Sequence, residues 1–246
     1  MKKTGYEPLF TLKPVAPDVW VVDGPTISFY GMPFPTRMTV IRLEGGNLFV
    51  HSPIELTDEL KESAQKLGPV RVMVAPNWIH YAYVPQWQEA FPDAITWAAP
   101  GVSERAESRG MEIDFDHVFG SEPRADLADE IDHLLVEGSS IHHEVVFFHR
   151  PSRTLILTDL IENFEPSKMP LWTRPLIFVA GIGDPDGKAP IDMRFSFRKN
   201  RDQLQQAVQQ MLDWKPERVI LAHGRWYKEN GTEELRRAFR WAFPRT

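Results

Sequence analysis

Side chains of the types that bind metals follow apolar segments at four places in this chain. The four residues are His51, His80, Asp159 and His223, each within a few residues of a short apolar run. Binding sites of α/β sheets lie beyond the carboxyl ends of the strands, so we expect these side chains to gather at one sheet edge. Imidazole nitrogens and carboxylate oxygens suit Zn, Fe or Mn. Such a metal lowers the pKa of a bound water toward neutrality and presents hydroxide to a carbonyl or phosphoryl centre.

Residues 142–159 add a second group of polar side chains. Strand-forming residues at 145–148 and 154–157 flank a turn at 150–153, a pattern typical of a β-hairpin. The hairpin places His142, His143 and Glu144 beside Asp159. Successive side chains of a strand alternate between its faces, so only one of the two histidines is expected to point inward. Glu144 is a candidate to orient a ligand imidazole or to move a proton, and Asp159 is a candidate for both metal binding and catalysis.

Each of these residues also has an ordinary structural interpretation. A lone histidine at a strand end is more often hydrogen-bonded than metal-bound. Asp159 can simply cap a helix over the residues that follow it. Three other histidines, His117, His133 and His149, lie in polar or turn surroundings and are predicted to be structural or exposed. The convergence of several strand ends, rather than any residue alone, favours a site.

Strand and helix signals alternate between residues 48 and 108, which predicts an α/β fold. Thr57 is a capping residue for a helix over 58–67, and Gly68 ends that helix. Further strands are expected at 18–23, 38–43, 47–51, 70–74, 94–98, 133–136 and 218–222. Further helices are expected at 84–91, 102–108, 171–182, 200–214 and 233–243. Residues 24–37 are expected to form a loop, and the Pro- and Gly-rich residues 163–192 an insertion or lid within a single domain over residues 1–246.

The composition is that of an ordinary globular protein and excludes several classes of function. The chain has 246 residues, of which 42% are hydrophobic, and a net charge of -6. No basic stripe favours nucleic acid, and the absence of cysteine excludes disulfides, Fe–S clusters and Cys-ligated zinc. The N-terminus lacks the apolar run of a signal peptide, and no apolar run is long enough to span a bilayer. A cytoplasmic protein without a membrane partner is therefore expected.

Three stretches resemble motifs of the metallo-β-lactamase superfamily, and more closely its DUF4336 branch. Residues 154–160 (TLILTDL) resemble the strand that ends in T-G-D-L, whose aspartate bridges metals. Residues 219–224 (VILAHG) resemble the strand that ends in a G-H-G metal histidine, and residues 72–81 resemble the segment of the H-x-H-x-D-H motif. Residues 48–56 and 71–99 are similar to the DUF4336 pattern. The resemblance implies an α/β fold, an αββα four-layer sandwich of two mixed β-sheets flanked by helices, with the site along one edge.

The chain departs from this superfamily at the ligand positions. The H-x-H-x-D-H positions fall on Pro76, Trp78, His80 and Tyr81, so one candidate ligand remains there. Gly138-Ser139-Ser140 stands where the family has G-H-T-x-G, and His142 or His143 is the nearest replacement. The resemblance therefore implies a reduced, mononuclear site with the ligands His80, His143, Asp159 and His223. Residues expected around the metal or substrate are His51, Asn77, Trp78, His142 and Trp226.

Three functions remain open at this point. The first is a metal-dependent hydrolase with one divalent transition metal (Zn, Fe or Mn), acting on a small ester, amide, thioester or phosphoester. The alternative is a metal-free, non-catalytic relative that uses the same cleft as a ligand-binding pocket, which the missing motif and the many aromatic residues near the site support. A weaker alternative is a non-haem iron redox protein. The expected partner is a small molecule, not nucleic acid or membrane, and residues 163–192 are either a lid or a homodimer contact.

Overall fold

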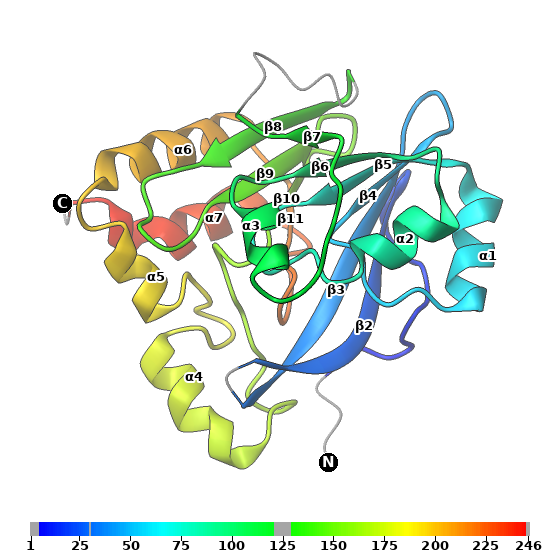
Figure 1. The fold of residues 1–246 in the computed structure, drawn as a ribbon. Coiled ribbons are helices and arrows are strands. Elements are labelled where there is room, and N and C mark those ends of the chain that lie inside the picture. Colours follow the sequence, from blue (N-terminus) through cyan, green and yellow to red (C-terminus); the bar gives the residue numbers. More distant parts are fainter. Residues whose placement is uncertain (1–4, 30, 121–128, 245–246) are drawn as a thin grey trace.

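The computed structural model describes residues 5–29, 31–120 and 129–244. Two β-sheets lie face to face, and helices cover their outer faces (Figure 1). The larger sheet contains, in spatial order, β1 (Lys13–Ala16), β2 (Val19–Phe29), β3 (Met32–Arg42), β4 (Leu48–His51), β5 (Val70–Ala75), β6 (Ile95–Ala98) and β7 (His117–Val118). The smaller sheet contains β11 (Arg218–Ile220), β10 (Thr154–Ile156), β9 (Glu144–His149) and β8 (Ile131–Val136). The predicted αββα sandwich is confirmed.

Both sheets are mixed, and their parallel parts create the edge at which the candidate ligands meet. Strands β1 to β4 pair antiparallel, whereas β4 to β7 pair parallel. In the smaller sheet β8, β9 and β10 pair antiparallel, and β11 runs parallel to β10. The carboxyl ends of parallel neighbours share one edge of a sheet. The loop after β4 therefore lies beside the loop after β5, and the loop after β10 lies beside the loop after β11.

Side-chain alternation along the strands separates the space between the sheets from the outer layers. In β9, Val145 and Phe147 face the core between the sheets, while Val146 and Phe148 face the helices. In β5, Val72 and Val74 face the same inter-sheet core. Each such side chain contributes about 1.5–3 kcal/mol by leaving water, so this two-sided burial holds the four layers together.

The helices complete the outer layers. Leu60 of α1 (Asp58–Leu67) and Trp87 of α2 (Val84–Ala90) pack on the outer face of the larger sheet. Leu204 of α6 (Arg201–Asp213) and Phe239 of α7 (Gly231–Phe239) pack on the outer face of the smaller sheet. As predicted, Thr57 caps α1 by accepting a hydrogen bond from the backbone N–H of Leu60. The helices are α1 (Asp58–Leu67), α2 (Val84–Ala90), α3 (Val102–Glu107), α4 (Arg174–Ala180), α5 (Ile191–Ser196), α6 (Arg201–Asp213) and α7 (Gly231–Phe239), with 3-10 turns η1 (Leu171–Thr173) and η2 (Arg240–Ala242).

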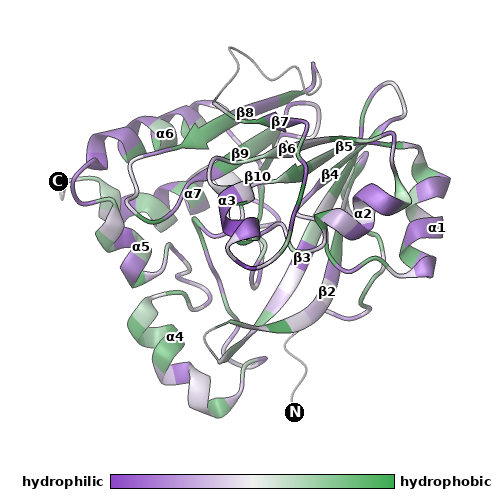
Figure 2. Cartoon of the chain, in the orientation of Figure 1, coloured by the Kyte–Doolittle hydropathy of each residue, from purple (hydrophilic) through white to green (hydrophobic). Residues whose placement is uncertain are grey.

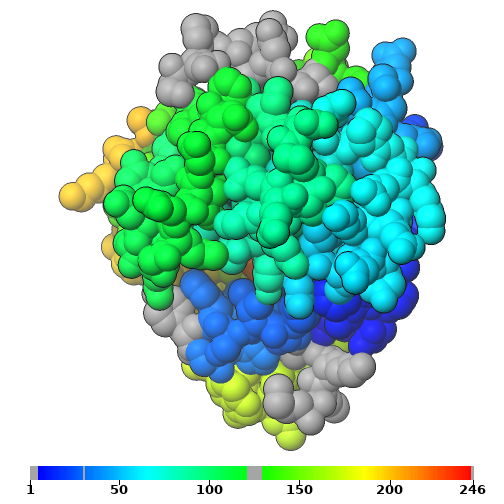
Figure 3. Space-filling model, turned by 45° about the vertical axis from the view of Figure 1, so that its right-hand side comes forward, coloured from blue at the N-terminus to red at the C-terminus, as the bar shows by residue number. Residues whose placement is uncertain are grey.

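The segment 163–192 was expected to contain one helix over 171–182. It contains the short turn η1 followed by α4, because Pro175 stands at the beginning of α4 and Gly181 ends it in a left-handed conformation. Ile177 of α4 packs against Phe34 and Phe164. Most of the other apolar side chains of η1 and α4 face solvent, and Phe178 is 86% exposed. Figure 2 shows hydrophobic residues along α4. The segment lies beside the β2–β3 hairpin, as the yellow-green and blue surfaces at the foot of Figure 3 show.

Residues 24–37 do not form the expected loop: the strands β2 and β3 continue through most of them as a long hairpin. Pro33 and Pro35 had indicated a loop, but this half of β3 pairs only with β2, and β4 begins its pairing at Thr39. Proline is tolerated where one side of a strand has no ladder partner. The helix α5 was also not predicted. That residues 1–246 form one domain stays a prediction.

None of the helices that the structure describes has the length and apolar character needed to cross a membrane.

Candidate metal centre

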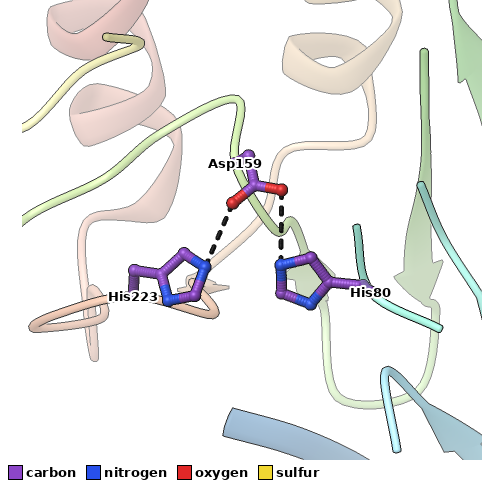
Figure 4. Close-up of side chains that lie close together, drawn as sticks. All are labelled: His80, Asp159 and His223. Carbon is purple, nitrogen blue, oxygen red and sulfur yellow. Dashed lines mark ion pairs between the residues drawn. The ribbon is translucent and has the colours of Figure 1, made fainter. Parts of the chain in front are cut away.

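The side chains of His80, Asp159 and His223 lie close together beyond the carboxyl ends of strands from both sheets (Figure 4). His80 lies in the loop after β5, Asp159 follows β10, and His223 follows β11. Nε2 of His80 lies 3.3 Å from Oδ2 of Asp159, and Nε2 of His223 lies 3.1 Å from Oδ1. One ligand atom from each residue fits within 4.8 Å of the others. Each carboxylate oxygen therefore faces a different imidazole.

The tautomer of His223 follows from its second partner. Nδ1 lies 2.8 Å from the backbone carbonyl oxygen of Pro35 in β3. A carbonyl oxygen can only accept a hydrogen bond, so Nδ1 carries a proton. In the neutral ring Nε2 then presents a lone pair to Asp159. Phe34 and Phe164 pack against the same ring, at centroid distances of 5.1 and 6.4 Å, and fix its plane.

The loop that carries His223 is tied to the larger sheet by Arg37. This side chain is buried, and its Nη1 donates to the backbone oxygens of Leu221 (2.6 Å) and Gly224 (2.9 Å) on either side of His223. Asp23 balances its charge at 2.7 Å. Gly224 is required here because its φ is +85° and an added Cβ would lie 2.1 Å from the backbone oxygen of Asn163. The sequence motif His223-Gly224 thus has a backbone reason as well as a chemical one.

Asn77 holds the other two candidate ligands in place from a fully buried position. Its Oδ1 accepts the backbone N–H groups of Ile79 (2.9 Å) and His80 (3.1 Å), which shapes the loop after β5. Its Nδ2 donates to Oγ1 of Thr158 (2.8 Å) and to Oδ2 of Asp159 (2.6 Å). Nδ1 of His80 contacts the hydroxyl of Ser52 at 2.6 Å, which fixes the ring from its far side. Metal-binding side chains are typically oriented by such partners.

Glu144 was expected to orient an imidazole or transfer a proton, and the structure gives its carboxylate a different position. The side chain is fully buried at the beginning of β9. Oε1 accepts the backbone N–H of Thr158 at 2.7 Å, and Oε2 accepts those of Asp159 (2.8 Å) and Leu160 (3.2 Å). Both oxygens are thus engaged in shaping the turn that presents Asp159. These contacts give Glu144 a positioning role, and its catalytic role stays a prediction.

The two adjacent histidines separate as strand alternation predicts, but the inward one is not free to bind a metal. His142 is buried, and its Nδ1 lies 3.0 Å from the indole Nε1 of Trp78, which can only donate. Its Nε2–H therefore donates to Oε2 of Glu144 at 3.2 Å, so both ring nitrogens are occupied. His143 is exposed and belongs to neither group of potential ligands. His143 was expected to bind the metal, but its side chain is exposed and lies outside both groups of potential ligands.

His51 and Trp226 were both expected around the metal or substrate, and their surroundings differ from each other. His51 is buried at the end of β4, next to Ser52, and its Nε2 has no hydrogen-bond partner among the described residues. Burial, with a smaller contribution from the charge of His80, lowers the pKa of His51 to about 3, so this ring is neutral. Trp226 packs at the margin of the two apolar cores, with Lys228 over its ring at 5.6 Å. Trp226 thus makes the contacts of a packing residue, and its place around the metal or substrate stays a prediction.

Two carboxylates near the centre have opposite pKa shifts. Burial alone would raise the pKa of Asp159, but the imidazoles of His80 and His223 hold it well below its usual range. Burial raises the pKa of Glu162, and the negative charges of Asp159, Asp192 and Glu144 add to that effect. Oε2 of Glu162 is buried without a hydrogen-bond partner. Asp159 is thus kept ionised, and the protonated form of Glu162 is favoured.

Comparison with known proteins gives a family and a fold. The family model described as a domain of unknown function (DUF4336) matches residues 17–180. The chain belongs to the DUF4336 family. Among curated proteins nothing matches this DUF4336 protein.

Solved metallo-β-lactamases share the whole fold of this DUF4336 protein at low sequence identity. The DIM-1 enzyme exposed to ceftazidime is 16% identical, with a TM-score of 0.65, over 96% of this chain and 97% of that one. The FIM-1 enzyme from Pseudomonas aeruginosa, in its mono-zinc form, is 12% identical, with a TM-score of 0.65 and 94% of each chain covered. A metallo-β-lactamase from Hirschia baltica is 15% identical, with a TM-score of 0.64, over 96% and 99% of the two chains. The predicted family and fold are both confirmed.

Three supporting residues of this DUF4336 protein were not singled out from its sequence. They are Arg37, Ser52 and Thr158, which orient His223, His80 and Asn77 respectively. A charged residue inside an otherwise uncharged strand segment was a usable signal for Arg37, because a buried arginine needs hydrogen-bond acceptors. Ser52 and Thr158 carry no such signal, since small hydroxyl residues are common in turns.

Proposed function

We propose that this protein is a metal-dependent hydrolase with a single divalent transition metal, Zn, Fe or Mn, held by His80, Asp159 and His223. The proposed substrates are small esters, amides, thioesters or phosphoesters. One observation carries the proposal. Nε2 of His223 faces a carboxylate oxygen at 3.1 Å, while Nδ1 of the same ring is committed as a donor to a carbonyl.

That arrangement requires a positive charge between the two groups. A neutral His223 and an ionised Asp159 would present two lone pairs to each other, which is unfavourable in a buried position. Either a metal ion or a second imidazole proton resolves the conflict. Two imidazoles and one carboxylate are a donor set that suits Zn and non-haem Fe and leaves coordination positions for water and substrate. The residues present therefore fit a metal.

The protein's own residues have distinct tasks in the proposed reaction. A bound metal would lower the pKa of a coordinated water and polarise the substrate oxygen. Asp159 stays ionised, and Asn77 and Glu144 fix its side chain and its backbone turn. The carbonyl of Pro35 holds His223 in the tautomer that exposes Nε2. Glu162, whose protonated form is favoured, is a candidate to hold a proton close to the centre.

The comparisons support the mononuclear form of this proposal. The FIM-1 metallo-β-lactamase, which shares the fold, was solved in a mono-zinc form. The second cluster of potential ligands, His142, Glu144 and Asp159, has its imidazole and Glu144 oxygens already occupied by hydrogen bonds. A single metal at the first cluster is therefore the arrangement that the side chains favour.

Metal stoichiometry of the purified protein tests the proposal. The protein would be stripped with a chelator, reconstituted separately with Zn(II), Mn(II) and Fe(II), and analysed by mass spectrometry of its metal content. We expect one metal per chain in the wild type and in the control variant His143→Ala, whose side chain is exposed. Asp159→Ala and His223→Ala should retain less than about one tenth of that amount. A wild-type protein that binds no metal would refute the proposal and favour a metal-free pocket with an imidazolium–carboxylate pair.

Activity separates the remaining alternatives. Reconstituted protein would be assayed with chromogenic esters, thioesters, amides and phosphoesters, with Asp159→Ala as the blank. Metal-dependent turnover of one of these classes is expected. Binding of iron with a coloured or redox-active centre, but without hydrolysis, would favour the non-haem iron alternative instead.

A further inference from the structure

A second site with a different character lies in the outer helical layer. A cavity of about 790 Å³ opens between α5, the beginning of α6 and the C-terminal segment. Figure 1 shows these three parts beside one another at the left of the molecule. Four cationic residues, Lys188, Arg194, Arg201 and Arg240, line it together with the aromatic residues Trp241 and Phe243. The metal centre, in contrast, lies at the carboxyl ends of the strands.

Positive charge exceeds negative charge in this cavity. Among the described residues its lining includes no carboxylate. Asp186 lies nearby and pairs with Lys188 at 2.9 Å and with Arg240 at 2.7 Å. Arg194 and Arg201 have no ion pair within the part of the chain that the structure describes. Asp186 thus pairs with two of the four cations, and the other two form no ion pair with a described residue.

Two hydrogen-bond donors of the lining are buried without a partner. They are Nε of Arg194 and Nε1 of Trp241. Arg194 donates through Nη2 to the backbone oxygen of Ala180, but burial still lowers its pKa, as expected for a cation without a counter-ion. Buried donors are rarely left unpaired in folded proteins, because losing water without gaining a partner costs free energy.

We propose that this cavity binds the phosphate group of a small phosphate ester whose organic part packs against Trp241 and Phe243. A phosphate monoester carries a charge between about -1.5 and -2 near pH 7 and offers three acceptor oxygens, which matches the two cations that form no ion pair within the described residues. A cavity of about 790 Å³ lies within the range for drug-sized ligands, about 300–1,000 Å³, so it accommodates more than a bare anion. The site does not depend on the metal centre.

Calorimetric titration of the full chain tests this site with three probes: adenosine 5′-monophosphate, inorganic phosphate and adenosine. We expect adenosine 5′-monophosphate to bind one per chain, more tightly than inorganic phosphate, and adenosine not to bind. Arg201→Gln and Arg194→Gln should each weaken binding of the ester by about tenfold, because each removes a charge-assisted contact. Arg201 is exposed and has no ion pair within the described residues, so its replacement leaves the fold intact.

Two controls assign the binding to the cavity. Arg236→Gln removes an arginine on α7 whose side chain is 61% exposed and only ion-pairs with Glu233, and it should leave affinity unchanged. His223→Ala disables the proposed metal centre and should also leave affinity unchanged. Loss of binding in His223→Ala, equal affinity in wild type and Arg201→Gln, or no binding of the ester would each overturn the proposal. Equal affinities for phosphate and the ester would overturn the role given to the organic part.

Discussion

Replacement of Asn77 by alanine should impair both stability and metal binding, since one buried side chain orients two candidate ligands. Asn77→Ala removes four hydrogen bonds. The hydroxyl of Thr158 and the carboxylate of Asp159 lose their side-chain donor in a buried region. At about 1–3 kcal/mol for each unpaired buried group, the free energy of unfolding should fall by about 2–6 kcal/mol.

The same substitution should weaken metal binding beyond its effect on stability. Without Asn77, Oδ2 of Asp159 loses its 2.6 Å donor, and the loop that presents His80 loses its organising acceptor. Loss of one orienting partner typically lowers metal affinity by about 10–100-fold. Because the N–H of His80 also lies 3.3 Å from the backbone oxygen of Asn77, the loop keeps part of its shape. Weakened rather than abolished binding is therefore expected.

Two measurements on the same protein samples check these effects. Urea denaturation of the metal-free protein gives the change in unfolding free energy, and competition with a chromophoric chelator gives the zinc affinity of the folded protein. Asn47→Ala is the control, because the side chain of this half-buried asparagine in the β3–β4 turn forms no hydrogen bond with a described residue. An Asn77→Ala variant within about 0.5 kcal/mol of the wild type, with unchanged zinc affinity, would refute the reasoning.

Three further predictions concern pH and backbone conformation. The pKa of His51 is lowered to about 3, so the stability that its neutral form supplies is present above pH 6.5 and is lost as the pH falls. Between pH 8 and pH 5 the unfolding free energy of the metal-free wild type should fall by about 2 kcal/mol more than that of His51→Leu. Urea denaturation at both pH values measures this difference. The pKa of Glu162 is raised in the folded protein, so the stability that its protonated form supplies is lost as the pH rises above the pKa of the unfolded chain. Between pH 5 and pH 8 the unfolding free energy of Glu162→Gln should therefore rise relative to that of the wild type. The same pH dependence in both proteins would contradict this. Gly224→Ala should lower the unfolding free energy by more than Gly101→Ala does, for which about 1–2 kcal/mol is expected. Both glycines have a positive φ, but only a Cβ at Gly224 would meet backbone atoms. Equal shifts of the thermal unfolding temperature in the two variants would contradict this.

Much of the fold between β4 and α3 was predictable, because the capping and turn residues there agree with the pattern of apolar residues. The helix α1 has a capping threonine, a terminal glycine and a buried face, and the predicted range matches the observed one. The buried strands β5 and β6 are short apolar runs that no helix pattern competes with. The long β2–β3 hairpin was missed because its prolines are usually loop signals. Prolines are compatible with a strand only where one side of that strand has no hydrogen-bonded neighbour, and the sequence does not show where a sheet ends.

The candidate centre was predictable in part for a similar reason. His80, Asp159 and His223 follow apolar strands, so a sheet edge was enough to bring them together. The choice between His142 and His143 depended on the turn at Ser139, whose hydroxyl accepts the backbone N–H groups of Ile141 and His142. The role of Glu144 depended on which backbone groups would surround it. Neither of these contacts is encoded in residue spacing.

The candidate ligands come from both sheets, and this has a consequence for the order of folding. His80 is carried by the larger sheet, whereas Asp159 and His223 are carried by the smaller one. The centre therefore exists only after the two sheets have docked. A metal bound there would join the sheets as a crosslink in a chain that has no cysteine, and at a thousandfold excess over its dissociation constant it would stabilise the docked state by about 4 kcal/mol. Metal uptake during refolding should accordingly follow the slow, long-range step of sheet docking rather than the formation of the individual helices.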